Sequence, residues 1–263
     1  MFTHLDHLNV AVDDLEAAAE NYQKLFGMTP VWSGEHKELG TSNALFAFKN
    51  TYFELLSASG EGLGADLVNH YLNQSGEGLI GIVFATDDIK KAKSSLEEQG
   101  FNMPDISSGE GINSSDQQVR RWKNLFLPPE LSRGLFSFII EHTEGALPSP
   151  MSYAPSSPHS LDHVVINTND ADSFIDIYKD AFGIRLALDK TIEHWKKRML
   201  FFRLSKTTIE VIEEQNDQET ADTLWGLAWN VASIEETHKR LLGEGVDITP
   251  IKKGIKDKTL VAT

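Results

Sequence analysis

Cysteine is absent from the 263 residues of the chain. Its absence excludes disulfides, thiolate nucleophiles and cysteine metal sites, so that any bound metal must be held by His, Asp, Glu or water. Positive charge is also scarce, with 24 Lys and Arg residues against 39 Asp and Glu residues and a formal net charge of −15. Because phosphate contacts need clustered basic side chains, this balance argues against a nucleic-acid partner.

Long hydrophobic runs are missing as well. No segment approaches the ~20 consecutive apolar residues that a membrane-spanning helix requires, and the N-terminus lacks the basic stretch and apolar core of a secretory signal. The hydrophobic content of 40% is nevertheless that of a globular protein. We therefore expect a cytoplasmic protein that is not associated with a membrane.

An internal repeat is the most informative feature that is present. The segment Leu5–Val10 returns as Leu161–Ile166, and the same offset of 156 residues superposes three further features. These pairs are Tyr22 with Tyr178, Phe26-Gly27 with Phe182-Gly183, and Glu54 with Glu210. Such self-similarity at a fixed spacing is typical of duplicated structural units.

Each copy is predicted to form a strand, a helix and then three strands, because its hydrophobic period changes from two to 3.6 and back. In the first copy, alternating apolar residues over 8–12 indicate a strand, and Asp13-Asp14 supplies a helix N-cap. A helical pattern follows over 15–26 and ends at Gly27. Three strand-like segments lie near 29–32, 44–48 and 51–56.

Two weaker copies complete the pattern, one after each strong copy. Their first strands are predicted at 79–86 and 224–231, and each is followed by a helix that ends in glycine, at Gly100 and Gly245. The last copy has too few residues for its final strand. The predicted fold class is α+β, with paired βαβββ modules that form curved mixed sheets around a cavity and a fourth module that is incomplete.

The two halves are separated by a segment rich in proline and serine, which favours an extended linker. We therefore predict one domain of two modules over 1–145, a linker over 146–160, and a second domain over 161–263 made of one module and a partial one.

His and Glu side chains recur at equivalent places of the strong copies. In a curved sheet of βαβββ modules the first and last strands lie close together, so we expect His7 and Glu54, and likewise His163 and Glu210, to face one cavity. Glu141 ends an apolar strand and adds a carboxylate that is costly to bury without a partner. An alternative is that these pairs are structural, with each histidine bonded to a neighbouring carboxylate.

These motifs resemble the vicinal oxygen chelate superfamily, which includes glyoxalase I, extradiol dioxygenases and fosfomycin resistance proteins. The resemblance rests on Leu5-Asp6-His7, Phe26-Gly27 and the run Tyr52–Leu56. A narrower likeness over about residues 4 to 145, to a mostly uncharacterised glyoxalase-like domain family, rests on Gly34-Glu35-His36, Gly40–Asn43 and Gly78–Gly81. The looser likeness continues over 160–250.

The resemblance implies a divalent metal, such as Zn, Ni, Mn or Fe(II), and no organic cofactor. It assigns His7, Glu54 and Glu141 as metal ligands, with Gly81 in the place of a fourth. A second, weaker site would hold only His163 and Glu210, because Gly226 replaces another ligand. In a different pairing of modules, His7, Glu54, His163 and Glu210 together would form a two-His, two-Glu site.

Four further residues are expected to contact a substrate. His36 and Asn43 belong to the glyoxalase-like motif, although they would also suit a simple turn. Arg121 and Trp122, in the run Arg120-Arg121-Trp122, would bind an anionic group, or Trp122 would instead pack in the sheet while the arginines face solvent. His142 follows Glu141 and is expected on the opposite face of its strand, outside the site.

The leading functional hypothesis is a metal-dependent lyase or isomerase that acts on a small oxygenated molecule, with Glu54 as a ligand or general base. A ring-opening dioxygenase fits less well, because Gly81 occupies the position of its second histidine. The alternatives are a non-catalytic protein that sequesters a small molecule, as bleomycin-resistance proteins do, and a scaffold whose cavities are filled by side chains. A missing edge strand would also favour a homodimer.

Overall fold

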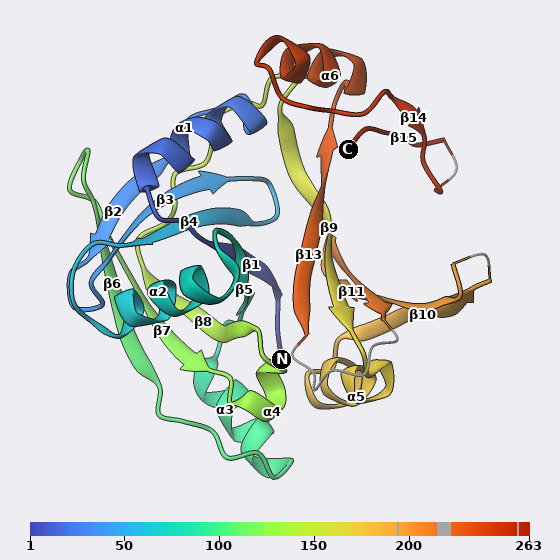
Figure 1. Cartoon of the computed structure of the whole chain (residues 1–263). Helices are drawn as coiled ribbons and strands as arrows, with labels where there is room; N and C mark the ends of the chain where they lie inside the picture. Colours follow the sequence, from blue (N-terminus) through green and yellow to red (C-terminus); the bar gives the residue numbers. More distant parts are fainter. Residues whose placement is uncertain (194, 215–221, 257) are drawn as a thin grey trace.

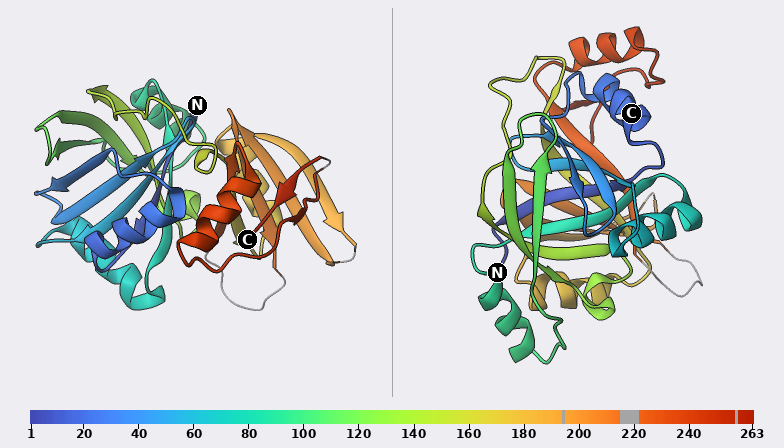
Figure 2. Two further views of the ribbon diagram at one scale, coloured as in Figure 1. Left: turned by 90° about the horizontal axis from the view of Figure 1, so that it is seen from above. Right: turned by 90° about the vertical axis from the view of Figure 1, so that its left-hand side faces the viewer.

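The computed structural model describes residues 1–193, 195–214, 222–256 and 258–263. The chain folds into two units that lie side by side, a closed barrel and an open curved sheet (Figures 1 and 2). The prediction of an α+β fold made of βαβββ modules is confirmed. Among these residues, no helix is long and apolar enough to cross a membrane.

The first unit contains the first two modules, with an additional helix, α2, between them. The first module consists of β1 (His4–Ala11), α1 (Leu15–Phe26), β2 (Trp32–His36), β3 (Thr41–Ala47) and β4 (Tyr52–Ala58). After α2 (Leu63–Ser75), the second module consists of β5 (Gly78–Ala85), α3 (Ile89–Glu98), β6 (Ser107–Asn113), β7 (Val119–Phe126), α4 (Pro129–Ser132) and β8 (Phe136–Glu144). Asp14 and Asp88 cap α1 and α3 by accepting backbone N–H bonds.

The strands of the first unit close into a barrel in the order β1-β4-β3-β2-β6-β7-β8-β5. The sequential modules therefore pair with each other. Helix α2 packs its Val68 against Ala11 of β1 and Leu56 of β4. It thus covers the end of the barrel at which these two strands finish (Figure 1).

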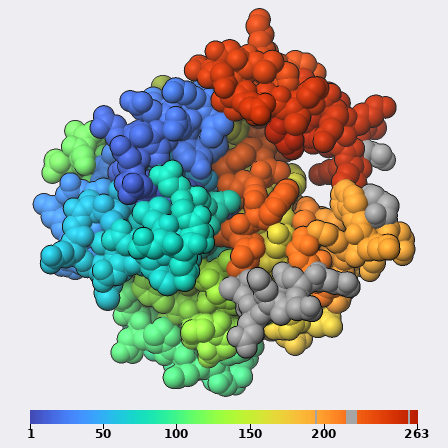
Figure 3. Space-filling view, viewed as in Figure 1, coloured from blue at the N-terminus to red at the C-terminus, as the bar shows by residue number. Residues whose placement is uncertain are grey.

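The second unit is an open sheet of order β10-β11-β12-β9-β13. Its elements are β9 (Pro158–Thr168), α5 (Ala171–Ile175), the π-helical turn η1 (Asp176–Ala181), β10 (Arg185–Ile192), β11 (Lys197–Leu204), β12 (Thr207–Glu213), β13 (Thr223–Val231) and α6 (Ile234–Gly243). The fourth module continues only with β14 (Lys252–Lys253) and β15 (Leu260–Val261), which form a separate two-stranded sheet. The surface is hollowed between this C-terminal segment and the strands of the open sheet (Figure 3).

Strand register confirms that the two strong copies are equivalent. Asn9 of β1 lies between Glu54 of β4 and Gly81 of β5. At the corresponding place of the second unit, Val165 lies between Glu210 and Gly226. The offset of 156 residues in the sequence is therefore an equivalence of position in the sheets.

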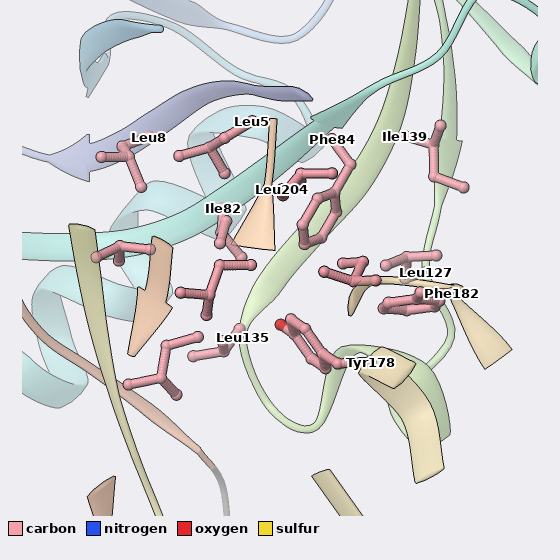
Figure 4. Packing of buried hydrophobic residues seen from close by; sticks show 14 of the residues in the cluster. Leu5, Leu8, Ile82, Phe84, Leu127, Leu135, Ile139, Tyr178, Phe182 and Leu204 are labelled. Atoms are coloured by element: carbon pink, nitrogen blue, oxygen red, sulfur yellow. The ribbon is translucent and has the colours of Figure 1, made fainter. Parts of the chain in front are cut away.

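The hydrophobic core is shared between the two units. Leu8 of the barrel's outer face belongs to the same buried cluster as Phe202 of the open sheet. Phe84 meets Tyr178 with ring centroids 6.1 Å apart, and Figure 4 shows Tyr178 and Phe182 packed beside residues of the barrel. Burial of this face explains why Leu8 and Val10 of β1 are apolar, while the polar side chains of His7 and Asn9 point into the barrel.

The segment predicted as a linker lies against the first unit. Tyr153 donates its hydroxyl to the carbonyl oxygen of Ala47 at 3.2 Å, and Ser157 donates to that of Gly27 at 3.1 Å. Residues 158–160 already belong to β9. The division into domains at 146–160 stays a prediction, as does the homodimer.

Candidate functional site

Polar side chains gather inside the barrel of the first unit because of the two-residue period of its strands. His7 and Asn9 of β1 point inward, whereas Leu8 and Val10 between and after them belong to the outer core. Glu54 of β4 and Asn43 of β3 reach the same interior. All four side chains are buried, so the sequence expectation that His7 and Glu54 share a site is met by the structure.

His7 is fixed at both ring nitrogens. Its Nδ1 lies 2.7 Å from Oδ1 of Asp6, and its Nε2 lies 3.4 Å from Oε2 of Glu54. The other oxygen of Asp6 lies 2.9 Å from Nε2 of His142. Burial alone would raise the pKa of Asp6, but the hydrogen bonds with His142 and His7 hold it well below its ordinary value. Asp6 is therefore an ionised carboxylate that orients two histidines.

The Glu54 carboxylate accepts a hydrogen bond at each oxygen. The amide of Asn9 donates to Oε2 at 3.1 Å, and the amide of Asn43 donates to Oε1 at 2.7 Å. Asn43 also lies 3.4 Å from Nε2 of His36, whose Nδ1 is 3.1 Å from the Thr41 hydroxyl. Two N–H donors stabilise a negative carboxylate in a buried place, so the interior holds a fixed anionic oxygen.

Aromatic rings line the same interior. Tyr52 stacks on the ring of His7, with centroids 4.4 Å apart and an interplanar angle of 15°. Burial raises the pKa of Tyr52 well above its ordinary value, so that the phenol keeps its proton. Burial lowers the pKa of His36, so that its imidazole is neutral. Trp122 meets the edge of His36, with centroids 5.8 Å apart.

Arg120 is a cation in the barrel interior, and the sequence named it only as part of the run Arg120-Arg121-Trp122, not among the expected site residues. It precedes Arg121 on β7 and is only 5% exposed. Its guanidinium carbon lies 5.5 Å from the ring centroids of both Trp32 and Tyr52. Because residues two apart in a strand share a face, Arg120 lies on the same face of β7 as Trp122, which was among the expected substrate contacts.

Of the two alternatives for Arg121, the structure agrees with exposure to solvent, because this residue lies on the outer face of the barrel. Its side chain is 46% exposed and pairs with Glu110 at 2.7 Å and with Glu144. The two hydrogen-bonded carboxylates raise the pKa of Arg121 above its ordinary value. The guanidinium that reaches the barrel interior is that of its neighbour, Arg120.

The structure corrects the expectation for Glu141. Its carboxylate accepts the backbone N–H of Ile89 at 2.8 Å and pairs with Lys123 at 3.0 Å, outside the barrel. The hydrogen bond from Ile89 lowers the pKa of Glu141. His142, which was expected to point away, instead reaches Asp6. The three residues directly before Glu141 are all apolar, so they do not show which face of the strand Glu141 shares, and the sequence assigned it to the wrong face.

The second unit repeats the Asp-His-Glu arrangement in a more open setting. Nδ1 of His163 lies 3.0 Å from Asp162, and its Nε2 lies 3.7 Å from Glu210. The amides around Glu54 are lost here, because Val165 and Met199 stand at the positions of Asn9 and Asn43. Burial raises the pKa of Glu210, with the nearby His163 opposing the shift. This carboxylate is held less firmly in its ionised form.

The donor set does not fit the metal site that the resemblance implies. Of the three assigned ligands, His7 and Glu54 lie together and Glu141 faces away. Both oxygens of Glu54 already accept amide hydrogens. Within the described ranges, no group of three or more His, Asp or Glu side chains is arranged to hold a metal ion. His163 and Glu210 lie in the other unit, so the four-ligand site of the alternative pairing does not form either.

Gly81, at the place of the fourth ligand, leaves no room for a side chain. A Cβ there would lie 2.8 Å from the Phe136 carbonyl oxygen and 3.0 Å from Oδ1 of Asn9. We expect Gly81→Ala to lower the free energy of unfolding by about 1–3 kcal/mol, the usual cost of overpacking. The measurement is urea denaturation. Gly226→Ala is the matched control, because a Cβ at this equivalent glycine meets nothing within 4 Å; an equal loss in both variants would refute the steric explanation.

Two family models and a curated protein match parts of this chain. Residues 5–182 match a family model described as a glyoxalase-like domain, and residues 160–259 match the model of the Glyoxalase/Bleomycin resistance protein/Dioxygenase superfamily. A curated relative is the ethylmalonyl-CoA/methylmalonyl-CoA epimerase of Cereibacter sphaeroides. It is 30% identical over 110 residues, which are 42% of this chain and 79% of the epimerase.

Two solved structures share the fold over most of the chain. A hypothetical protein from Staphylococcus aureus has a TM-score of 0.60 at 15% identity, covering 81% of this chain and 86% of that one. A mutant of 4-hydroxymandelate synthase from Streptomyces coelicolor has a TM-score of 0.65 at 16% identity, covering 95% of this chain and 77% of that one. At these identities, the likeness concerns the fold alone.

Proposed function

Because the chain belongs to the glyoxalase-like domain family, within the glyoxalase, bleomycin resistance and dioxygenase superfamily, we propose that its barrel catalyses proton transfer at a carbon atom next to a carbonyl group. The protein would be an isomerase of the epimerase type for a small oxygenated substrate. The observation that carries this proposal is the Glu54 carboxylate, which is buried, doubly hydrogen-bonded and placed beside His7.

Glu54 is the general base of the proposed reaction. The C–H bond next to the carbonyl breaks, its proton goes to Glu54, and its electron pair moves onto the carbonyl oxygen as an enolate. Return of a proton from Glu54 to the same face restores the substrate, whereas return after the planar enolate has turned its other face to the carboxylate inverts the configuration of the carbon. His7, oriented by Asp6, and the amides of Asn9 and Asn43 keep the carboxylate in place.

The class of substrate comes from the curated relative, whose name gives ethylmalonyl-CoA and methylmalonyl-CoA as the compounds it epimerises. We carry over a 2-substituted malonyl thioester as the first class to test. We derive no step through a divalent metal, because the third expected ligand of this site, Glu141, lies outside the barrel and both oxygens of Glu54 accept amide hydrogens.

Exchange of the α-proton in deuterated water is the direct test. Methylmalonyl-CoA is incubated with the protein in D2O, and loss of the α-proton signal is followed by ¹H NMR, with EDTA and separately with Zn, Ni, Mn and Fe(II). We expect exchange at least about 100-fold faster than without protein, the lower range for a positioned general base. Binding of the thioester with no acceleration in any arm would favour sequestration, and neither binding nor exchange would reject the proposal.

A further inference from the structure

We infer that Arg120 is the receptor for a carboxylate group inside the barrel, so that the substrate carries a carboxylate next to its reacting carbon. This inference deepens the proposed function, since it names the part of the substrate that the site recognises. Three observations lead to it: the burial of Arg120, the lack of an acidic partner, and its position relative to Glu54.

The burial of Arg120 is costly unless an anion offsets it. A guanidinium keeps its positive charge throughout the pH range in which proteins fold, and a buried charge without a counter-charge destabilises the folded state. Arg120 is only 5% exposed. None of the described Asp and Glu side chains forms an ion pair with it, which is unusual for an arginine inside a barrel.

The groups that surround Arg120 attract it without neutralising it. The rings of Trp32 and Tyr52 offer cation–π contacts, and the buried Tyr52 phenol stays uncharged. The Nε–H of Arg120 is buried and has no hydrogen-bond partner. A donor of this kind is expected to be satisfied in the working protein, and a carboxylate is the planar acceptor that suits a guanidinium.

The positive charge of Arg120 and the negative charge of Glu54 lie in the same interior but do not touch. Both act on His36 and on Tyr52, while Glu54 is held by amides and His7 instead. A carboxylate bound at Arg120 would direct the carbon attached to it toward the interior that Glu54 occupies. A malonyl-type carbon, which has a carboxylate on one side and a second carbonyl on the other, fits this arrangement.

Binding of malonate, measured by isothermal titration calorimetry, tests the inference without any turnover. Malonamide is the uncharged control ligand, and inorganic phosphate separates a carboxylate receptor from a general anion site. Arg120→Gln removes the charge and Arg120→Lys keeps it without the planar fork. Arg121→Gln is the matched control, because it removes the neighbouring arginine on the outer face.

We expect the wild type to bind malonate, and to bind malonamide at least about tenfold more weakly. Malonate binding should weaken at least about tenfold in Arg120→Gln, consistent with the loss of one charge-assisted pair. It should fall less in Arg120→Lys and stay within about twofold in Arg121→Gln. Equal binding by wild type and Arg120→Gln, or no malonate binding by the wild type, would overturn the inference, and tighter binding of phosphate than of malonate would overturn the assignment to a carboxylate.

A thermal-shift measurement on Arg120→Met distinguishes a loss of malonate binding from a loss of the fold. This apolar replacement removes the buried charge, so the unliganded variant should melt at the same or a higher temperature than the wild type. Malonate should raise the melting temperature of the wild type and leave that of Arg120→Met unchanged; an equal rise in both would count against Arg120. Proton exchange that persists without malonate binding would refute this inference but not the proposed function. Malonate binding without proton exchange would refute the proposed function but not this inference.

Discussion

Replacing Glu54 by glutamine is expected to lower the rate of α-proton exchange by about 1,000-fold, within the range for loss of a positioned general base. Glutamine preserves the size of the side chain but cannot accept the proton. One of the two amides that now donate to Glu54, those of Asn9 and Asn43, would have to turn. The rate constants are measured in D2O by NMR for wild type and variant at equal protein concentration, and circular dichroism confirms that both are folded.

Glu210→Gln provides a control that the duplicated fold itself supplies. Glu210 occupies the same strand position beside His163 but lacks the amide donors. Its replacement should change the exchange rate by less than about threefold, because a site outside the proposed machinery contributes little. If Glu210→Gln abolishes exchange and Glu54→Gln does not, the reaction belongs to the open sheet and the barrel is a structural copy.

Replacing Asp6 by asparagine is expected to lower the free energy of unfolding by about 3 kcal/mol at pH 7, since one partner of a buried charged network is removed. Asp6 is 4% exposed and contacts both His7 and His142. The equivalent Asp162 is 40% exposed and contacts His163 and Asn230. Asp162→Asn is therefore the matched control, with an expected loss below about 1 kcal/mol. Both values come from urea denaturation.

The stability that Asp6 contributes should decrease as the pH falls. Its pKa in the folded protein is lowered, so the carboxylate stabilises the fold above the ordinary carboxyl pKa of about 4 and loses this contribution as the pH falls further. The difference in stability between wild type and Asp6→Asn should therefore be constant from pH 7 to about pH 5 and shrink below about pH 4. A difference that grows on acidification would contradict the assignment of Asp6 as an ionised partner.

The sequence was sufficient to predict the fold and the pairing of His7 with Glu54. Both follow from local periodicity and from the repeat, and the equal registers around Asn9 and Val165 show why a constant offset was informative. Asn9 was within reach of the same reasoning, because it lies two residues after His7 and so shares its face. Its hydrogen bond to Glu54 depends on the register in which β1 pairs with β4, and this register could not be predicted from the sequence.

The positions of Glu141 and Arg121 outside the barrel were difficult to predict for a common reason. Each requires knowing which face of a strand points inward, and one residue of displacement exchanges the two faces. The β7–β8 pairing also carries a register irregularity between Arg121 and Trp122. Contacts between residues of different strands decide which face of a strand points inward, and a single sequence does not reveal these contacts.

Helix α2 and the shared core also lay beyond the sequence reasoning. The segment Leu63–Ser75 was not recognised as a helix, although it covers one end of the barrel. The sequence predicted two separate domains, and it did not predict that Phe84 and Tyr178 would pack together. The choice between sequential and crossed pairing of modules depends on these long-range contacts, which arise only when the sheets curve and close.

A crystal structure of the protein with malonate tests the central claim most directly, namely that the reacting carbon lies between Arg120 and Glu54. We expect the ligand inside the barrel of the first unit, with one carboxylate on the Arg120 guanidinium and the methylene carbon facing the Glu54 carboxylate. Malonate bound beside His163 and Glu210 in the open sheet, with Arg120 left without an anion, would contradict the account.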